Sequence, residues 1–141
     1  MYLLDTNTVS ELRKVASGKA DPRVANWITS VSPSALYVSV ITIEELRIGV
    51  LRIERRDALQ GALLRHWLVE GVLHAFSDRI LSVDLAVAEC SARMQVPDPR
   101  PIRDAYISAT AVVHGLTVVS RNVSDFTACG AQVLNPWLAP A

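Results

Sequence analysis

Tyr2-Leu3-Leu4-Asp5-Thr6-Asn7 is the stretch that decides the fold. The apolar run directly after Met1 is too short for a helix and is typical of a buried strand, while Thr-Asn is a turn or helix-start signal. We therefore expect Asp5 at the carboxyl end of a strand, which is the edge where open α/β sheets bind ligands. Taken alone, the stretch favours a simple helix cap. A functional interpretation depends on other polar side chains reaching the same edge.

The rest of the chain alternates between short apolar runs and segments with helical spacing. Strands are predicted over 2–5, 36–40, 80–84, 116–119 and 132–134, and helices over 8–15, 21–31, 42–56, 57–73, 85–94 and 102–114. Such alternation implies parallel strands joined by right-handed crossovers. We predict a single domain over 1–141, an α/β three-layer sandwich with a central parallel sheet of about five short strands.

Composition excludes several classes of protein. Lys+Arg and Asp+Glu both number 14, so the 141-residue chain is neutral and unlike a protein that coats nucleic acid in bulk. No basic region precedes an apolar core at the start, and no apolar run approaches the length of a membrane span. We expect a cytoplasmic protein without a membrane partner, in which Cys90 and Cys129 are buried thiols.

Polar and mostly acidic side chains recur where the predicted strands end or where a helix begins. The set comprises Asp5 after the first strand, Glu44 and Glu45 after the second, Asp104 at the start of the helix before the fourth, and Asn122 and Asp125 after the fourth. In a parallel sheet these positions converge, and the repulsion between carboxylates then calls for a cation. Oxygen ligands without His or Cys favour Mg²⁺ or Mn²⁺. The pattern indicates metal-assisted hydrolysis of a phosphodiester.

Each acid also has a purely structural explanation. Glu45 fits a capping box with Thr42, and Asp104 suits a helix start through the macrodipole alone. Asp125 fits a cap of the turn before Phe126. Asp84 is best interpreted as an N-cap and is left out of the site. The functional interpretation therefore depends on the set and not on any one member.

Four segments resemble the motifs of the PIN-domain family, and within it the VapC-type toxins of bacterial toxin–antitoxin pairs. They are Leu3-Leu4-Asp5-Thr6-Asn7, Thr42-Ile43-Glu44-Glu45-Leu46-Arg47-Ile48-Gly49, Asp104-Ala105-Tyr106-Ile107-Ser108-Ala109-Thr110-Ala111 and Val119-Ser120-Arg121-Asn122-Val123-Ser124-Asp125-Phe126. The ending Val133-Leu134-Asn135-Pro136-Trp137 is similar to the FitB-like branch. The second motif selects Glu45 over Glu44. Single motifs are short, but four in this order are specific, and together they span nearly the whole chain.

The resemblance implies a metal-dependent endoribonuclease that uses Mg²⁺ or Mn²⁺ on an RNA substrate, forms a homodimer or a higher assembly, and is neutralised by a cognate, DNA-binding antitoxin. Asp5, Glu45 and Asp104 carry over as metal ligands. Relatives place the fourth acid where this chain has either Asn122 or Asp125, and we choose Asp125 as the fourth catalytic residue. The supporting residues are Thr6, Asn7, Ser120 and Asn122, and the first candidates for RNA contact are Arg103 and Arg121.

Two other functions remain open at this point. One is a different Mg²⁺-dependent phosphohydrolase, and the other is a non-catalytic PIN-like partner of a DNA-binding repressor, which Asn122 in place of an acid keeps open. Fold alone does not separate them. The helical stretch between about 42 and 75 carries more apolar residues than one small core needs, so we expect it to form the dimer surface.

Overall fold

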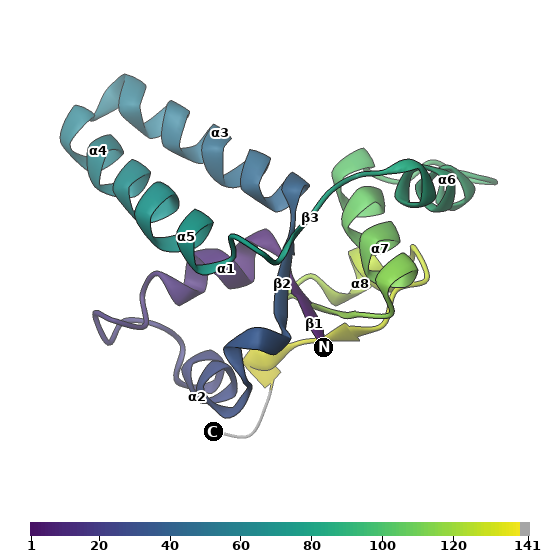
Figure 1. The fold of residues 1–141 in the computed structure, drawn as a ribbon, viewed down its shortest axis with the longest axis horizontal. Helices are drawn as coiled ribbons and strands as arrows, with labels where there is room; N and C mark the ends of the chain where they lie inside the picture. Colours follow the sequence, from purple (N-terminus) through teal and green to yellow (C-terminus); the bar gives the residue numbers. More distant parts are fainter. Residues whose placement is uncertain (139–141) are drawn as a thin grey trace.

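A five-stranded parallel sheet forms the centre of the molecule (Figure 1). The computed structural model describes residues 1–138. Its strands are β1 (Tyr2–Leu4), β2 (Leu36–Ser39), β3 (Ile80–Leu81), β4 (Thr117–Val119) and β5 (Val133–Leu134). They lie in the order β3-β2-β1-β4-β5, and each neighbouring pair is parallel. The predicted α/β fold with a parallel sheet is confirmed.

Helices connect these strands and mostly begin and end where the sequence predicts. They are α1 (Thr6–Leu12), α2 (Pro22–Ser30), α3 (Val40–Arg56), α4 (Ala58–His66), α5 (Leu73–Ala75), α6 (Leu85–Met94), α7 (Ile102–His114) and α8 (Val123–Thr127). Asp21 and Asp84 cap α2 and α6 by accepting from the backbone N–H groups of Arg23 and Val87 at 2.8 and 3.0 Å. Gly115 ends α7 in the left-handed region with φ 67°.

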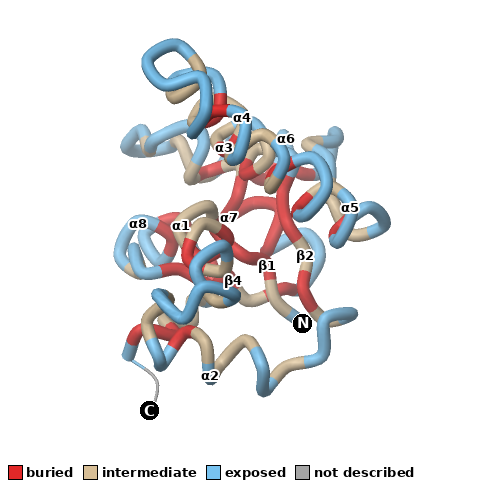
Figure 2. The backbone as a smooth tube through the Cα atoms, turned by 90° about the vertical axis from the view of Figure 1, so that its left-hand side faces the viewer, coloured by how far each residue is buried: buried red, intermediate tan, exposed pale blue. Residues whose placement is uncertain are grey.

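The alternation of side chains along the strands separates two cores. Leu4 and Val119 face the side covered by α1, α3 and the segment after α4, whereas Leu3 and Val118 face the side covered by α7 and α8. The buried strands between these two groups of helices form the middle layer (Figures 1 and 2). The helix α6 packs on α7 through a third, smaller cluster. The predicted three-layer sandwich is therefore confirmed.

The local predictions differ from the structure in a few places. The third strand ends at Leu81, because its partner β2 ends at Ser39 and Ser82 onward has no strand to pair with. The helical stretch predicted over 57–73 is confirmed, but its middle, Trp67–Val72, is a π-helical segment between α4 and α5 that was not predicted. The short helix α8 was not predicted, because five residues give no apolar period to recognise.

The helices α3 and α4 form a hairpin that projects from the sheet (Figure 1). The side chain of Arg65 donates from Nε and Nη2 to the Glu54 carboxylate at 2.6 and 2.8 Å, and this pair lowers the Glu54 pKa. A Cβ atom at Gly61 would lie 2.7 Å from the Glu54 Cα, so the two helices meet there backbone to backbone. Within residues 1–138, no helix has the length and apolarity needed to cross a membrane.

Candidate active site

The sheet changes direction at β1. From β1 the chain builds β2 and β3 on one side, and then crosses to build β4 and β5 on the other side. Loops leaving β1 and β4 at their carboxyl ends diverge, and such a switch point is where open α/β sheets form a binding crevice. Asp5 follows β1 and Ser120 follows β4, so both residues lie at this crevice.

Asp5 is a buried carboxylate with two donors. Its Oδ1 accepts from the backbone N–H of Thr6 at 2.7 Å, and its Oδ2 accepts from the Ser120 hydroxyl at 2.8 Å. The Ser120 oxygen in turn accepts from the backbone N–H of Asn122 at 2.9 Å. Burial, and to a smaller extent the charges of Glu45 and Asp104, raise the pKa of Asp5 to about 6 against the opposing effect of these donors. Asp5 thus caps α1 and also carries a destabilised charge at the crevice.

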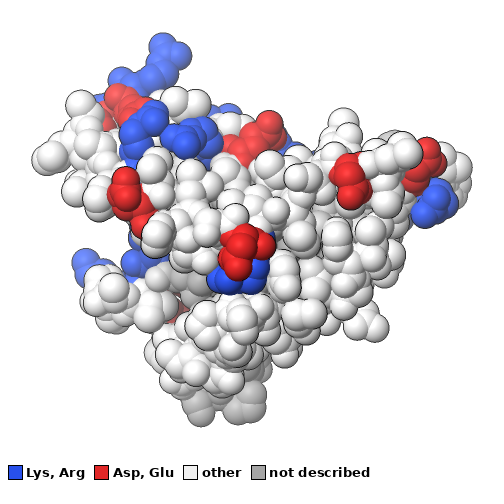
Figure 3. Space-filling view, viewed as in Figure 1, with Lys and Arg blue, Asp and Glu red and all other residues white. Residues whose placement is uncertain are grey.

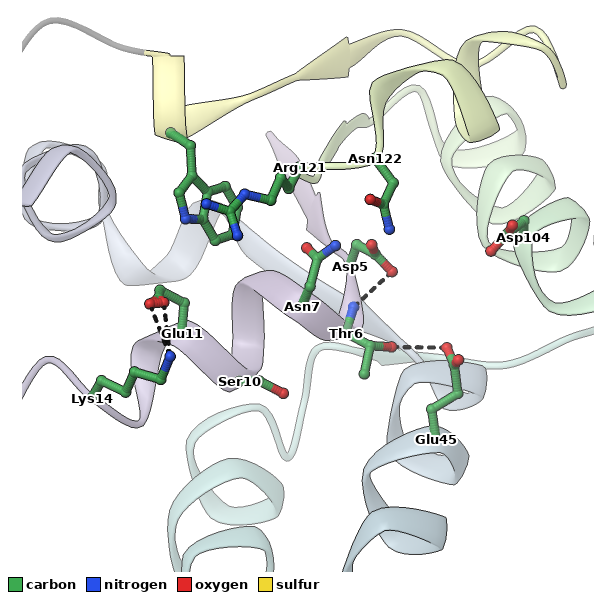
Figure 4. Close-up of a pocket in the computed structure, with 11 residues that line it drawn as sticks. Asp5, Thr6, Asn7, Ser10, Glu11, Lys14, Glu45, Asp104, Arg121 and Asn122 are labelled. Atoms are coloured by element: carbon green, nitrogen blue, oxygen red, sulfur yellow. Dashed lines mark hydrogen bonds and ion pairs between the residues drawn. The ribbon is translucent and has the colours of Figure 1, made fainter. Parts of the chain in front are cut away.

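Glu45 is held by a contact between two helices. Ser39 caps α3 by accepting from the Ile41 N–H at 3.0 Å, so α3 begins before Thr42, and the capping-box explanation of Glu45 is wrong. The Glu45 carboxylate instead accepts from the Thr6 hydroxyl at 2.8 Å. This bond connects the start of α1 to α3 and directs the second acid toward the crevice (Figure 4).

Asp104 reaches the same crevice from the first turn of α7. Partial burial raises its pKa, and the charges of Asp125 and Glu45 raise it further. Asp104 therefore interacts electrostatically with acids on two other elements. Asp125 itself is exposed in α8 and does not line the crevice, so its role as the fourth acid stays a prediction.

The crevice contains a pocket of about 480 Å³, which has the size of a ligand site. Its lining brings together these residues named from the sequence: Asp5, Thr6, Asn7, Glu45, Asp104, Arg121 and Asn122 (Figure 4). Ser120 lies behind Asp5 as its buried donor. Arg103 lies outside this pocket. It pairs with Glu44 at 3.4 Å beside a neighbouring hollow of about 650 Å³ that shares Glu45 and Asp104.

Four lining residues were not assigned to the site from the sequence: Ser10, Glu11, Lys14 and Trp137. The first three continue the face of α1 that starts at Asn7, at spacings of three, four and seven residues. That helical period was a signal available in the sequence. Trp137 lies in the short 3₁₀ helix Pro136–Leu138, far along the chain from α1, and only the fold brings it to the pocket.

The acids suit a hard, hydrated cation. Within the described part of the chain, no three His, Cys, Asp or Glu side chains lie close enough together to enclose one ion. Mg²⁺ is normally held by one or two carboxylates and keeps several of its waters, so acids spaced around an open pocket fit it better than a closed cage does. The donors are all oxygen, and a cation beside the buried Asp5 carboxylate would offset the cost of its charge.

Comparisons with known proteins give a consistent result over the whole chain. A model of the PIN domain matches residues 2–128. The VapC ribonuclease Y4jK of Sinorhizobium fredii is 37% identical over 97% of this chain and 98% of its own length. The toxin FitB of Neisseria gonorrhoeae is 34% identical over 97% and 99% of the two chains. The structure of FitAB bound to an IR36 DNA fragment aligns with a TM-score of 0.87 at 32% identity, covering 100% of this chain and 99% of that one.

Proposed function

The chain belongs to the PIN-domain family, and from that premise we propose that it is an endoribonuclease toxin, dependent on Mg²⁺ or Mn²⁺ and neutralised by a cognate antitoxin. The proposal depends on one observation above all. Asp5, Glu45 and Asp104 come from three separate elements and line one pocket at the switch point of the sheet. The names of two relatives, a ribonuclease and a toxin, support the reaction class.

In this mechanism Asp5, Glu45 and Asp104 surround the cation, which one or two of them would ligate directly and the others through its waters. The negative charge of Asp125 in α8 acts on the same site by repelling that of Asp104. The bound cation supplies charge neutralisation of the phosphate and a more acidic water. Asp5 is kept in place by Ser120 and by the start of α1, and Glu45 is kept in place by Thr6. Because these contacts exist before substrate arrives, little of the binding energy is spent on arranging ligands.

RNA is held locally in this proposal and not by a broad basic surface. The chain has no net charge, and Figure 3 shows charges of both signs scattered over one face, with the Lys and Arg residues most concentrated at the α3–α4 end. Arg121 lines the pocket, and Arg103 lines the neighbouring hollow that shares Glu45 and Asp104. Their phosphate contacts would add affinity without choosing a sequence.

The test is cleavage of total cellular RNA by the purified, antitoxin-free chain with Mg²⁺, with Mn²⁺ and with a chelator. Asp5→Asn is the inactive comparison, and Glu89→Gln is the matched control because Glu89 is exposed on α6 and lines neither the pocket nor the neighbouring hollow. We expect discrete metal-dependent fragments from the wild type and from the control only. Equal fragments in the chelator lane would exclude the metal mechanism. Intact RNA in every lane would favour the non-catalytic alternative.

We further propose that the active form is a homodimer that contacts itself through the α3–α4 hairpin. Leu51, Leu59 and Leu63 are 48%, 72% and 59% exposed there, which is costly for a free surface. Sedimentation at micromolar concentration should give twice the 15.4 kDa of one chain. A monomer under these conditions would exclude the homodimer without affecting the nuclease proposal.

The antitoxin proposal has its own test. The toxin name of one relative and the DNA-bound complex of the aligned FitAB structure support a partner that also binds DNA. If a small DNA-binding protein is encoded directly beside the chain, its co-expression with the chain should yield a stable complex whose RNA cleavage is suppressed. Cleavage that continues at the same rate in the purified complex would contradict neutralisation.

A further inference from the structure

The pocket has a second end that the three acids do not explain. Beyond Asn7 it is lined by Glu11 and Lys14 from the α1 side and by Arg121 and Trp137 from the opposite side. In Figure 4 the side chains of Glu11 and Lys14 lie on one side of Asn7, whereas Asp104 lies on the other side. The two ends are therefore parts of one pocket with different chemistry.

Glu11 is placed against the preference of its own helix. It lies in the last turn of α1, where the macrodipole disfavours a negative charge, and it is only 8% exposed. Its carboxylate pairs with the Lys14 ammonium at 3.3 Å, which compensates part of that cost. The macrodipole thus gives no reason for a carboxylate at this position, whereas the pair with Lys14 and the place of Glu11 in the pocket wall do.

Arg121 and Trp137 form a fixed flat surface opposite Glu11. The Arg121 guanidinium lies over the indole with its carbon 5.0 Å from the ring centroid. The indole residue is anchored through its backbone: its N–H donates to Asn135 Oδ1 at 2.9 Å, and its carbonyl accepts from Arg23 Nη1 at 2.9 Å. A guanidinium plane held in this way, next to a pocket, can stack on a nucleobase.

We propose that this end of the pocket is a nucleobase subsite, which binds the base beside the scissile phosphate and selects guanine. The proposal deepens the ribonuclease function and rests on it. The base stacks on Arg121, which Trp137 supports, and the Glu11 carboxylate accepts from its edge. Guanine offers adjacent N1–H and N2–H donors that match the two carboxylate oxygens, whereas uracil offers a single N3–H. Lys14 donates to both Glu11 oxygens, at 3.3 and 3.5 Å, and provides a cation for a neighbouring phosphate.

An RNA base suits this end better than a protein segment does. The stacking surface is planar, the opposite wall is a carboxylate, and both adjoin the acids that act on phosphate. A cationic side chain of the antitoxin would also pair with Glu11, but it would meet the Arg121 guanidinium across the pocket and be repelled by it. The antitoxin is therefore the alternative outcome of the test and not the proposal.

The first experiment measures binding without cleavage. The ¹⁵N-labelled chain is titrated with guanosine 5′-monophosphate and with uridine 5′-monophosphate in chelator, and the indole N–H signal of Trp137 is followed after its assignment with Trp137→Phe. We expect guanosine monophosphate to bind at least five-fold more tightly than uridine monophosphate. Glu11→Gln should remove most of that difference in affinity, and Arg121→Lys should weaken the binding of both nucleotides. Glu89→Gln is the control and should behave as the wild type.

Equal affinity for the two nucleotides in the wild type would overturn the proposal, and so would an unchanged difference in Glu11→Gln. A Glu11→Gln chain that loses its antitoxin but keeps the nucleotide difference would assign this end to the partner and also overturn it. The second experiment sequences the RNA ends produced with Mg²⁺, where a guanine preference beside the cut should be reduced in Glu11→Gln. If the RNA stays intact but the titration shows selective binding of guanosine monophosphate, the nuclease proposal is refuted and the nucleobase subsite is supported.

Discussion

Replacing Asp5 by Asn should abolish RNA cleavage and yet stabilise the metal-free chain. Burial raises the pKa of this carboxyl from its ordinary 3.8 to about 6, so folding at neutral pH places an unfavourable charge in the crevice. The difference between the two pKa values, at about 1.36 kcal/mol per pH unit, corresponds to about 3 kcal/mol. Asn keeps the shape and can still accept from the Thr6 N–H. Its amide nitrogen then faces Ser120 and can only donate, so the Ser120 hydroxyl loses its acceptor, which reduces the gain to about 1–3 kcal/mol.

The pH dependence of this gain is a sharper test than its size. Between pH 3.8 and about 6 the unfolded chain has released the Asp5 proton while the folded chain retains it. The folded chain binds more protons in this window, so this group lowers stability as pH rises through it. The cost is about 1 kcal/mol at pH 4.5 and about 3 kcal/mol at pH 8. The advantage of Asp5→Asn over the wild type should therefore grow by about 2 kcal/mol between these pH values, whatever constant cost the substitution carries.

Urea unfolding in chelator at pH 4.5, 6 and 8 measures this difference, and other titrating groups largely cancel because both chains contain them. Repeating the series with Mg²⁺ separates the charge effect from metal binding, since a cation that binds only the folded wild type stabilises it and reduces the gap. A stability difference that is constant within about 0.5 kcal/mol between pH 4.5 and 8 would refute the buried-charge account of Asp5. If Mg²⁺ stabilises the variant as much as the wild type, Asp5 is not a metal ligand.

Two further substitutions test how the fold holds the site. Thr6→Val removes the 2.8 Å bond to Glu45 and should cost about 1–2 kcal/mol of stability in urea unfolding, with a several-fold slower cleavage rate that Thr6→Ser largely restores. Equal cleavage rates for Val and wild type would show that this bond does not position Glu45. Gly61→Ala drives a Cβ into the Glu54 backbone and should destabilise the chain by about 1–3 kcal/mol, whereas Gly49→Ala in open space on the same hairpin should stabilise it by up to about 1 kcal/mol. Similar effects of the two alanines in thermal unfolding would contradict the close approach of α3 and α4.

The sequence predicts the framework well because the framework depends on local signals. Each core strand is a short apolar run, and Pro22 and Gly115 mark a helix start and a helix end through backbone preferences that hold in any context. The strand order and the π-helical segment in the long helix before β3 depend on which surfaces meet, and no local pattern records that. For the same reason the sequence did not assign Trp137 to the site: its position against Arg121 follows from the pairing of β5 with β4.

Glu45 shows why a site can be predicted as a set but not residue by residue. Thr42 and Glu45 have capping-box spacing, and the sequence alone does not decide whether the helix starts at Thr42. In the fold, Ser39 takes the cap, because β2 pairs with β3 up to that residue and α3 follows at once. This start leaves the Glu45 carboxylate without a donor in its own helix, so it accepts from the Thr6 hydroxyl on another helix instead.

Asp5 is both a helix cap and a member of the site, since the carboxylate that caps α1 is also the one buried at the crevice. A cap and a ligand are therefore not alternatives at such an edge: the cap fixes the carboxylate in place, and burial gives it the unmet charge that a cation relieves.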